Sequence, residues 1–71
     1  MEKIIATYRA QSDDGTVHEI YDIQEYENAS SQKGIAWIEG MKRLELADGR
    51  SVTEIDENSF EIIGGEIIRR I

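Results

Sequence analysis

The chain has 71 residues, a formal net charge of −7 and no cysteine. One domain, residues 1–71, fits this length, and a domain this small buries only about 60 to 65% of its unfolded surface, so its stability margin is thin. An acidic chain repels the phosphates of duplex DNA and the headgroups of anionic membranes, which argues against both as partners. The first nine residues hold too short an apolar run for a signal peptide, so we expect a cytoplasmic location.

A first hairpin is predicted around Asp14-Gly15, between apolar alternations at residues 4–10 and 17–23. A two-residue turn would pair Ile4 with Ile23, and a three-residue loop with Gly15 in the left-handed region would shift the register by one. In the first register His18 lies on the solvated face of the sheet.

Residues 27–34, ENASSQKG, form the longest polar stretch and predict a loop or a single helical turn. An apolar run at residues 35–38 follows and ends at Gly40. This glycine predicts either a bulge or bend within one long strand or a break between two strands.

Three turn signals, Asp48-Gly49, residues 56–58 and Gly64-Gly65, divide the rest of the chain into short apolar runs. A type I turn with Gly49 as its bulge residue would place Leu44 opposite Val52. A turn through Gly64-Gly65 would place Ile62 opposite Ile67, with Ile63 and Ile68 on the other face of the last hairpin.

This pattern of turns between short apolar runs predicts a single all-β domain, a small antiparallel meander of five to six short strands. An SH3-like or partly open barrel is one form of it, and at most one short helix is expected, near residues 27–34.

The segment from Asp48-Gly49 onward carries Val52, Ile55-Asp56, residues 60–62, Gly65-Glu66 and Arg69-Arg70. It resembles a motif of short uncharacterised bacterial proteins of about this length, and the resemblance covers the C-terminal part of the chain. That family has no assigned function. The chain is also similar to the SH3-like or Sm-like β-domains of bacterial lipoproteins but lacks their lipid-accepting cysteine, so their anchoring is not carried over.

No residues are predicted to be catalytic, to bind a cofactor or to hold a metal. His18 is the only histidine, there is no cysteine or Gly-x-Ser-x-Gly elbow, and no phosphate-binding glycine loop is present. The adjacent acids Asp13-Asp14 and Asp56-Glu57 are interpreted as turn formers, because acid/base catalysis needs two carboxyl groups that converge in a pocket.

The hypothesis for function is therefore a non-enzymatic module that binds a protein partner or a second copy of itself as a weak homodimer. The candidate interface residues are Trp37, Ile63, Ile68 and Tyr21, although a lone tryptophan between apolar neighbours is more often the centre of a core. Acids concentrated at residues 19–27 are a solubilising face or a docking surface for a basic partner. The alternative is a single-stranded nucleic-acid-binding small β-barrel with stacking aromatics.

Overall fold

A computed structural model describes residues 1–31 and 34–71 as one antiparallel meander that closes into a barrel. In chain order the strands are β1 (Glu2–Gln11), β2 (Val17–Ser31), β3 (Gly34–Leu46), β4 (Ser51–Asp56), β5 (Ser59–Ile62) and β6 (Ile67–Arg70). Closure comes from β1 and β6, which pair at Ala10 with Arg70 and at Gln11 with Arg69. The predicted all-β meander is confirmed.

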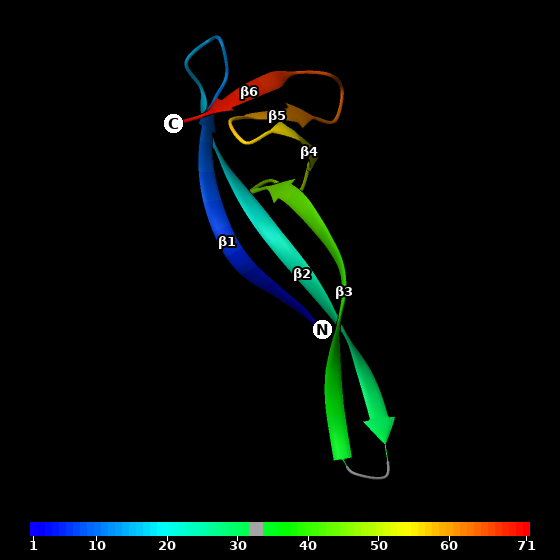
Figure 1. Cartoon of the computed structure of the whole chain (residues 1–71). Helices are drawn as coiled ribbons and strands as arrows, with labels where there is room; N and C mark the ends of the chain where they lie inside the picture. The colour runs from blue at the N-terminus through cyan, green and yellow to red at the C-terminus, as the bar shows by residue number, and fades with distance from the viewer. Residues whose placement is uncertain (32–33) are drawn as a thin grey trace.

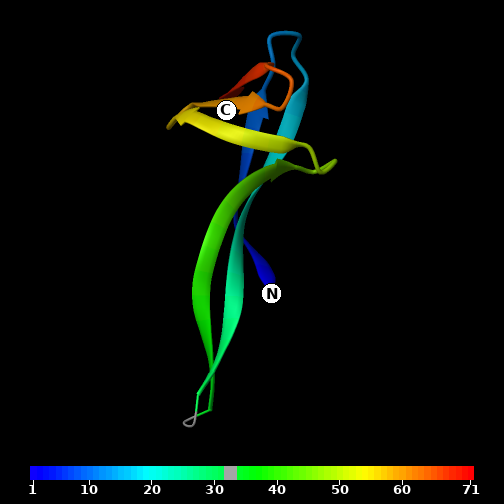
Figure 2. The same cartoon turned by 90° about the vertical axis from the view of Figure 1, so that its right-hand side faces the viewer.

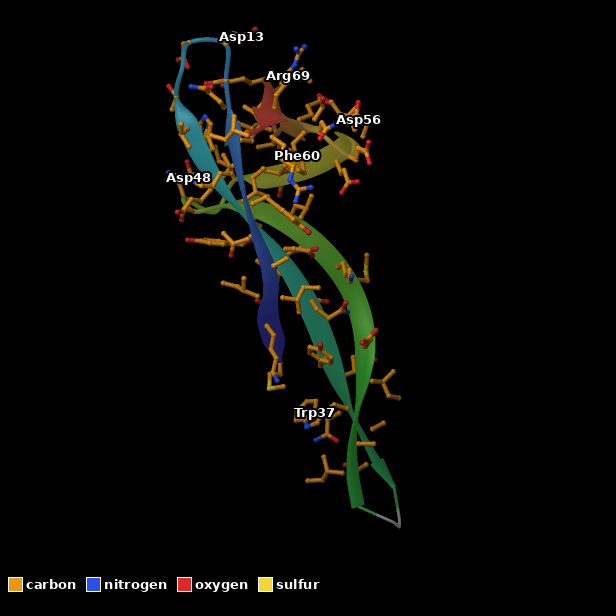
Figure 3. The ribbon with its side chains drawn as sticks, turned by 60° about the vertical axis from the view of Figure 1, so that its left-hand side comes forward. Asp13, Trp37, Asp48, Asp56, Phe60 and Arg69 are labelled. Atoms are coloured by element: carbon orange, nitrogen blue, oxygen red, sulfur yellow. The ribbon has the colours of Figure 1, made fainter. Side chains whose placement is uncertain are left out.

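The core lies inside the barrel, and every strand contributes to it. Its buried members are apolar residues of all six strands: Ala10, Ile20, Leu46, Val52, Phe60, Ile62 and Ile68. Phe60 is 2% exposed and stacks on the partly buried Tyr8, with ring centroids 6.2 Å apart. Figure 3 shows Phe60 among the strands of the barrel, in the upper half of the molecule and far from Trp37.

The three N-terminal strands continue far beyond the barrel (Figure 1). We call this projection the arm and define it as residues 2–5, 23–31 and 34–43. β1 begins beside Tyr26, where the Met1 amino group donates to the Tyr26 carbonyl at 3.0 Å. The far end of the arm, beyond this point, consists of β2 and β3 alone. The molecule measures 55 × 22 × 18 Å with a radius of gyration of 15.2 Å, against about 11 Å for a compact chain of this length. Figure 2 shows the arm from the side.

The first hairpin uses the three-residue loop. The Ser12 N–H donates to the Thr16 carbonyl at 2.9 Å, and Gly15 has a φ of 89°, a conformation that glycine adopts without strain. Tyr8 therefore pairs with Ile20. Ile4 still pairs with Ile23, because a bulge at Ile5 restores the other register.

The turn at Asp48-Gly49 has the predicted form. The Leu46 N–H donates to the Arg50 carbonyl at 2.8 Å, Gly49 has a φ of 92°, and Leu44 pairs with Val52. The predicted register is confirmed.

In the last hairpin the predicted pairing of Ile62 with Ile67 is wrong. The Ile62 N–H donates to the Glu66 carbonyl at 2.8 Å, so the loop holds three residues and Ile67 pairs with Glu61. A slip of one residue moves every side chain to the opposite face. Ile68 consequently pairs with Phe60 and is fully buried in the core.

The expectation of a loop over residues 27–34 is wrong for residues 27–31, which belong to β2, while residues 32–33 lie outside the described part of the chain. Gly40 lies within one long strand β3, at a bulge opposite Glu25, which confirms the first alternative for this glycine. The buried Gln24 side chain holds the bulge, because its amide donates to the Glu25 carbonyl at 3.0 Å and to the Gly40 carbonyl at 2.9 Å.

Candidate interaction surface

The arm exposes large apolar side chains that a small soluble domain normally buries. Four of them lie on β3, where Ile35 is 71%, Trp37 50%, Ile38 55% and Met41 77% exposed. Trp37 is therefore not the centre of the core, and the interpretation that favoured a core position is wrong. Figure 3 shows its ring on the arm, far from Phe60. The physical reason is that β3 joins the barrel only at Leu44, where it begins to pair with β4. No second layer covers the part of β3 that precedes this residue.

Both faces of the arm carry apolar groups. Opposed residues of an antiparallel pair point to the same face, and successive residues alternate. Trp37, opposite Asn28, shares its face with Ile35, whereas Ile38, opposite Glu27, lies on the other face with Ala36. The sequence already indicated apolar groups on both faces, because residues 35–38 do not alternate between apolar and polar residues. Such a run is typical of a strand that is covered on both sides.

The arm also presents strand edges, and their chemistry differs. β3 pairs with β4 only at Leu44 and Glu45, so residues 35–43 form an outer edge whose one acid is Glu39. The β1 edge is interrupted by the bulge at Ile5, and the β2 edge beyond Tyr26 is mostly polar. Bulges, charges and polar residues protect edges from pairing, so the least protected edge of the arm is residues 35–39, which precede the bulge of β3 and the charges of Lys42 and Arg43.

An ion network fastens the base of the arm. Arg43 of β3 contacts Glu2 of β1 at 2.8 Å, Glu25 of β2 at 3.0 Å and Glu45 of β3 at 3.0 Å. The hydrogen bond from Arg43 lowers the pKa of Glu2, and the hydrogen bonds to Glu2 and then Glu45 raise the pKa of Arg43. One guanidinium thus links the three strands, and its charge is already compensated by carboxylates.

The four predicted interface residues do not form one surface. Trp37 is on the arm, whereas Ile63 is 69% exposed in the β5–β6 turn of the barrel. Tyr21 of β2 is half-buried and donates to the Glu19 carboxylate at 3.3 Å. Ile68 is in the core, which removes it as a contact residue. Of the predicted set, Trp37 alone lies within the exposed apolar part of the arm.

Of the acids interpreted as turn formers, Asp14 and Asp56 act as such, and Asp48 does the same in its turn. Asp14, Asp48 and Asp56 each accept a hydrogen bond from the backbone N–H two residues further on, at 2.9, 3.0 and 2.8 Å. Hydrogen bonds from the Ser12 hydroxyl and then the Thr16 N–H lower the pKa of Asp14 from 3.8 to about 2. The backbone N–H of Arg50 lowers the pKa of Asp48 in the same way.

We expect Asp14→Asn to change the acid sensitivity of the protein. A carboxyl whose pKa is lower in the folded state stabilises the fold above its unfolded pKa, and this stability is lost as the pH falls through the folded value. The wild type should therefore lose stability relative to Asp14→Asn between about pH 4 and about pH 2. Urea midpoints across this range measure the difference. Asp13→Asn removes the same charge from the same turn, and an identical pH profile for both variants would contradict the prediction.

His18 does not lie on a solvated face. It pairs with Ala10 of the core and is half-buried, and its Nε2 is buried without a hydrogen-bond partner in the structure. The prediction that His18 lies on the solvated face assumed a two-residue turn. The three-residue loop shifts the pairing by one residue and places His18 on the face of Ala10. A surface depression of about 290 Å³ is lined by Val17, His18, Glu19, Leu46, Ala47 and Asp48. His18 has no cysteine to activate, since the chain contains none.

Two absences concern residues 1–31 and 34–71, the described part of the chain. No three His, Asp or Glu side chains in these residues are grouped so that they could hold a metal ion. The same ranges contain no helix with the length and apolarity needed to cross a membrane.

No family model, curated protein or solved structure gives a significant match to this chain. The resemblance to short bacterial proteins stays a prediction. The fold and the exposed surface of the arm are therefore the observations from which a function can be inferred.

Proposed function

We propose that this protein is a non-enzymatic interaction module that binds a protein partner through its arm. The observation that carries the proposal is the exposure of Ile35, Trp37, Ile38 and Met41 on a projecting strand with an outer edge. Aromatic and aliphatic groups of this kind anchor protein interfaces, and an exposed strand edge pairs with a strand of the partner.

Single-stranded nucleic-acid binding is less well supported, because several cations that it needs have other contacts. Arg43 and Arg50 form ion pairs with carboxylates, and the Arg70 guanidinium lies 4.5 Å from the ring centroid of Tyr8. The net charge of −7 opposes phosphate binding further. Duplex DNA is disfavoured as a partner for the same reason.

The test is a comparison of Ile38→Lys with Ile55→Lys. Ile38 on the arm and Ile55 in β4 of the barrel are 55% and 52% exposed, so the two substitutions remove similar surface and add the same charge. We expect a tagged wild type and Ile55→Lys to retain the same protein from a lysate, and Ile38→Lys to lose it.

A protein retained equally by both variants would contradict binding through the arm, and so would a wild type that retains no protein and does not self-associate. If the retained protein is lost after nuclease treatment of the lysate, the result would instead favour the nucleic-acid alternative.

A further inference from the structure

We infer that the partner of the arm is a second copy of this chain, bound edge to edge through antiparallel pairing of β3 with β3 of the other copy. The inference rests on the proposed function and names its partner. Three features of the arm carry it: its charge, its outer edge and the area that it exposes.

The acidity of the chain is not shared by the arm. Of the fifteen acidic residues, four lie in the arm and eleven outside it; the arm also holds Lys3, Lys42 and Arg43, so its formal charge is −1 of the −7 of the whole chain. Two arms can approach without strong repulsion, whereas two barrels cannot. A strongly basic partner would match the barrel better than the nearly neutral arm.

The pairing register is set by the bulge at Gly40–Met41. Residues 35–39 are the regular part of β3 beyond it, and a two-fold axis at Trp37 pairs these five residues with their copies. Trp37 then lies opposite Trp37 of the other copy, and Ile38 opposite Ala36. An axis at Glu39 would oppose two carboxylates, and one at Ile38 would bring the bulge residue Gly40 into the pairing, so both are less favourable.

This arrangement keeps the acidic barrels apart. Leu44, where β3 joins the barrel, is seven residues from Trp37, which corresponds to roughly 24 Å along an extended strand. In an antiparallel dimer the two barrels lie on opposite sides of the axis, so their separation is about twice that distance. This is several times the Debye length of about 8 Å at physiological ionic strength, and the repulsion between barrels is screened.

The exposed area sets the strength. Ile35, Trp37 and Ile38, the large apolar residues of the paired segment, together leave roughly 350 Å² of side chain exposed on each arm, from their exposed fractions and typical side-chain areas. A standard interface buries about 800 Å² on each partner, so the dimer is weak and depends on concentration.

Sedimentation equilibrium and light scattering between about 10 µM and 1 mM test the inference, because association follows mass action over such a range. We expect the mass to rise from 8.1 kDa towards twice that value, and Trp37 fluorescence to shift to the blue as its ring leaves water. Ile38→Lys should weaken association at least about tenfold, as expected for a desolvated charge at an apolar contact. Ile55→Lys should associate like the wild type.

A charge exchange tests the axis itself. Trp37→Lys and Trp37→Glu should each remain monomeric, because identical charges meet at the axis, and a mixture of the two should associate. A mixture that stays monomeric would overturn the proposed register. Circular dichroism of each variant shows whether its fold is retained, and Ile63→Lys provides a folded control with the same added charge on the barrel.

The two proposals fail in different ways. A wild type that remains at 8.1 kDa up to about 1 mM overturns self-association. If an unrelated protein is then retained by the wild type and by Ile55→Lys but not by Ile38→Lys, the interaction module stands with another partner. If Ile38→Lys changes neither the mass nor the retained proteins, both proposals are overturned.

Discussion

Replacing Phe60 with alanine should remove most of the free energy of unfolding and leave the protein only marginally stable at room temperature. Phe60 is 2% exposed at the centre of the barrel, and removing a buried phenylalanine costs about 3 to 5 kcal/mol through lost burial and the cavity left behind. Small domains have only about 5 to 15 kcal/mol to lose, and a chain of this size lies at the low end. Urea denaturation followed by far-ultraviolet circular dichroism measures the loss, since Trp37 lies outside the barrel and reports poorly on its core.

Trp37→Ala is the matched control for this prediction. It removes a larger aromatic side chain, but one that is 50% exposed on the arm, so at low protein concentration we expect a loss below about 1 kcal/mol. Equal losses for the two variants would mean that the ring of Trp37 is covered in the folded chain, against the structure.

The second large effect is expected at Ile68. Ile68→Ala should reduce the free energy of unfolding by about 2 to 5 kcal/mol, because its side chain is fully buried beside Phe60. Ile63→Ala, in the turn of the same hairpin, should change it by less than about 0.5 kcal/mol, since that side chain is 69% exposed.

Thermal and urea unfolding of these variants and of Ile67→Ala decide which register the last hairpin has. In the two-residue turn through Gly64-Gly65, Ile67 would share the buried face of Ile62, and Ile63 and Ile68 would both lie on the other face. A large loss for Ile67→Ala with small losses for Ile63→Ala and Ile68→Ala would therefore support that turn. Small losses for all three variants would show that the end hairpin contributes little to the core.

The barrel holds the core of the protein, and the arm carries the exposed apolar surface for which we propose a partner. The barrel core uses side chains of all six strands, whereas the arm has the Arg43 network at its base and the Gln24 amide at its bulge. Because surface ion pairs contribute little individually, we attribute the stability of the arm to the long β2–β3 ladder, to which β1 adds a third strand at the base of the arm. A partner that covers the arm would add stability without altering the barrel.

The sequence by itself determined the fold class and most of the turns. Asp14-Gly15, Asp48-Gly49 and Gly64-Gly65 interrupt runs of β-forming residues, and turn chemistry is local, so a meander could be recognised without tertiary information. The pairing of Leu44 with Val52 was predictable for the same reason, because the turn type sets the register of a hairpin.

The tertiary structure alone decided which face each strand buries and where the barrel ends. The loop at Gly64-Gly65 holds three residues, and this register places Ile68 in the core. The local sequence did not decide this, because two-residue and three-residue loops use similar turn residues. Residues 27–31 became a strand despite their polar composition, because β3 offers a continuous ladder to pair with. Trp37 is exposed for a related reason: burial depends on whether a second layer reaches that part of the strand, and no local pattern records the point at which β3 leaves the barrel.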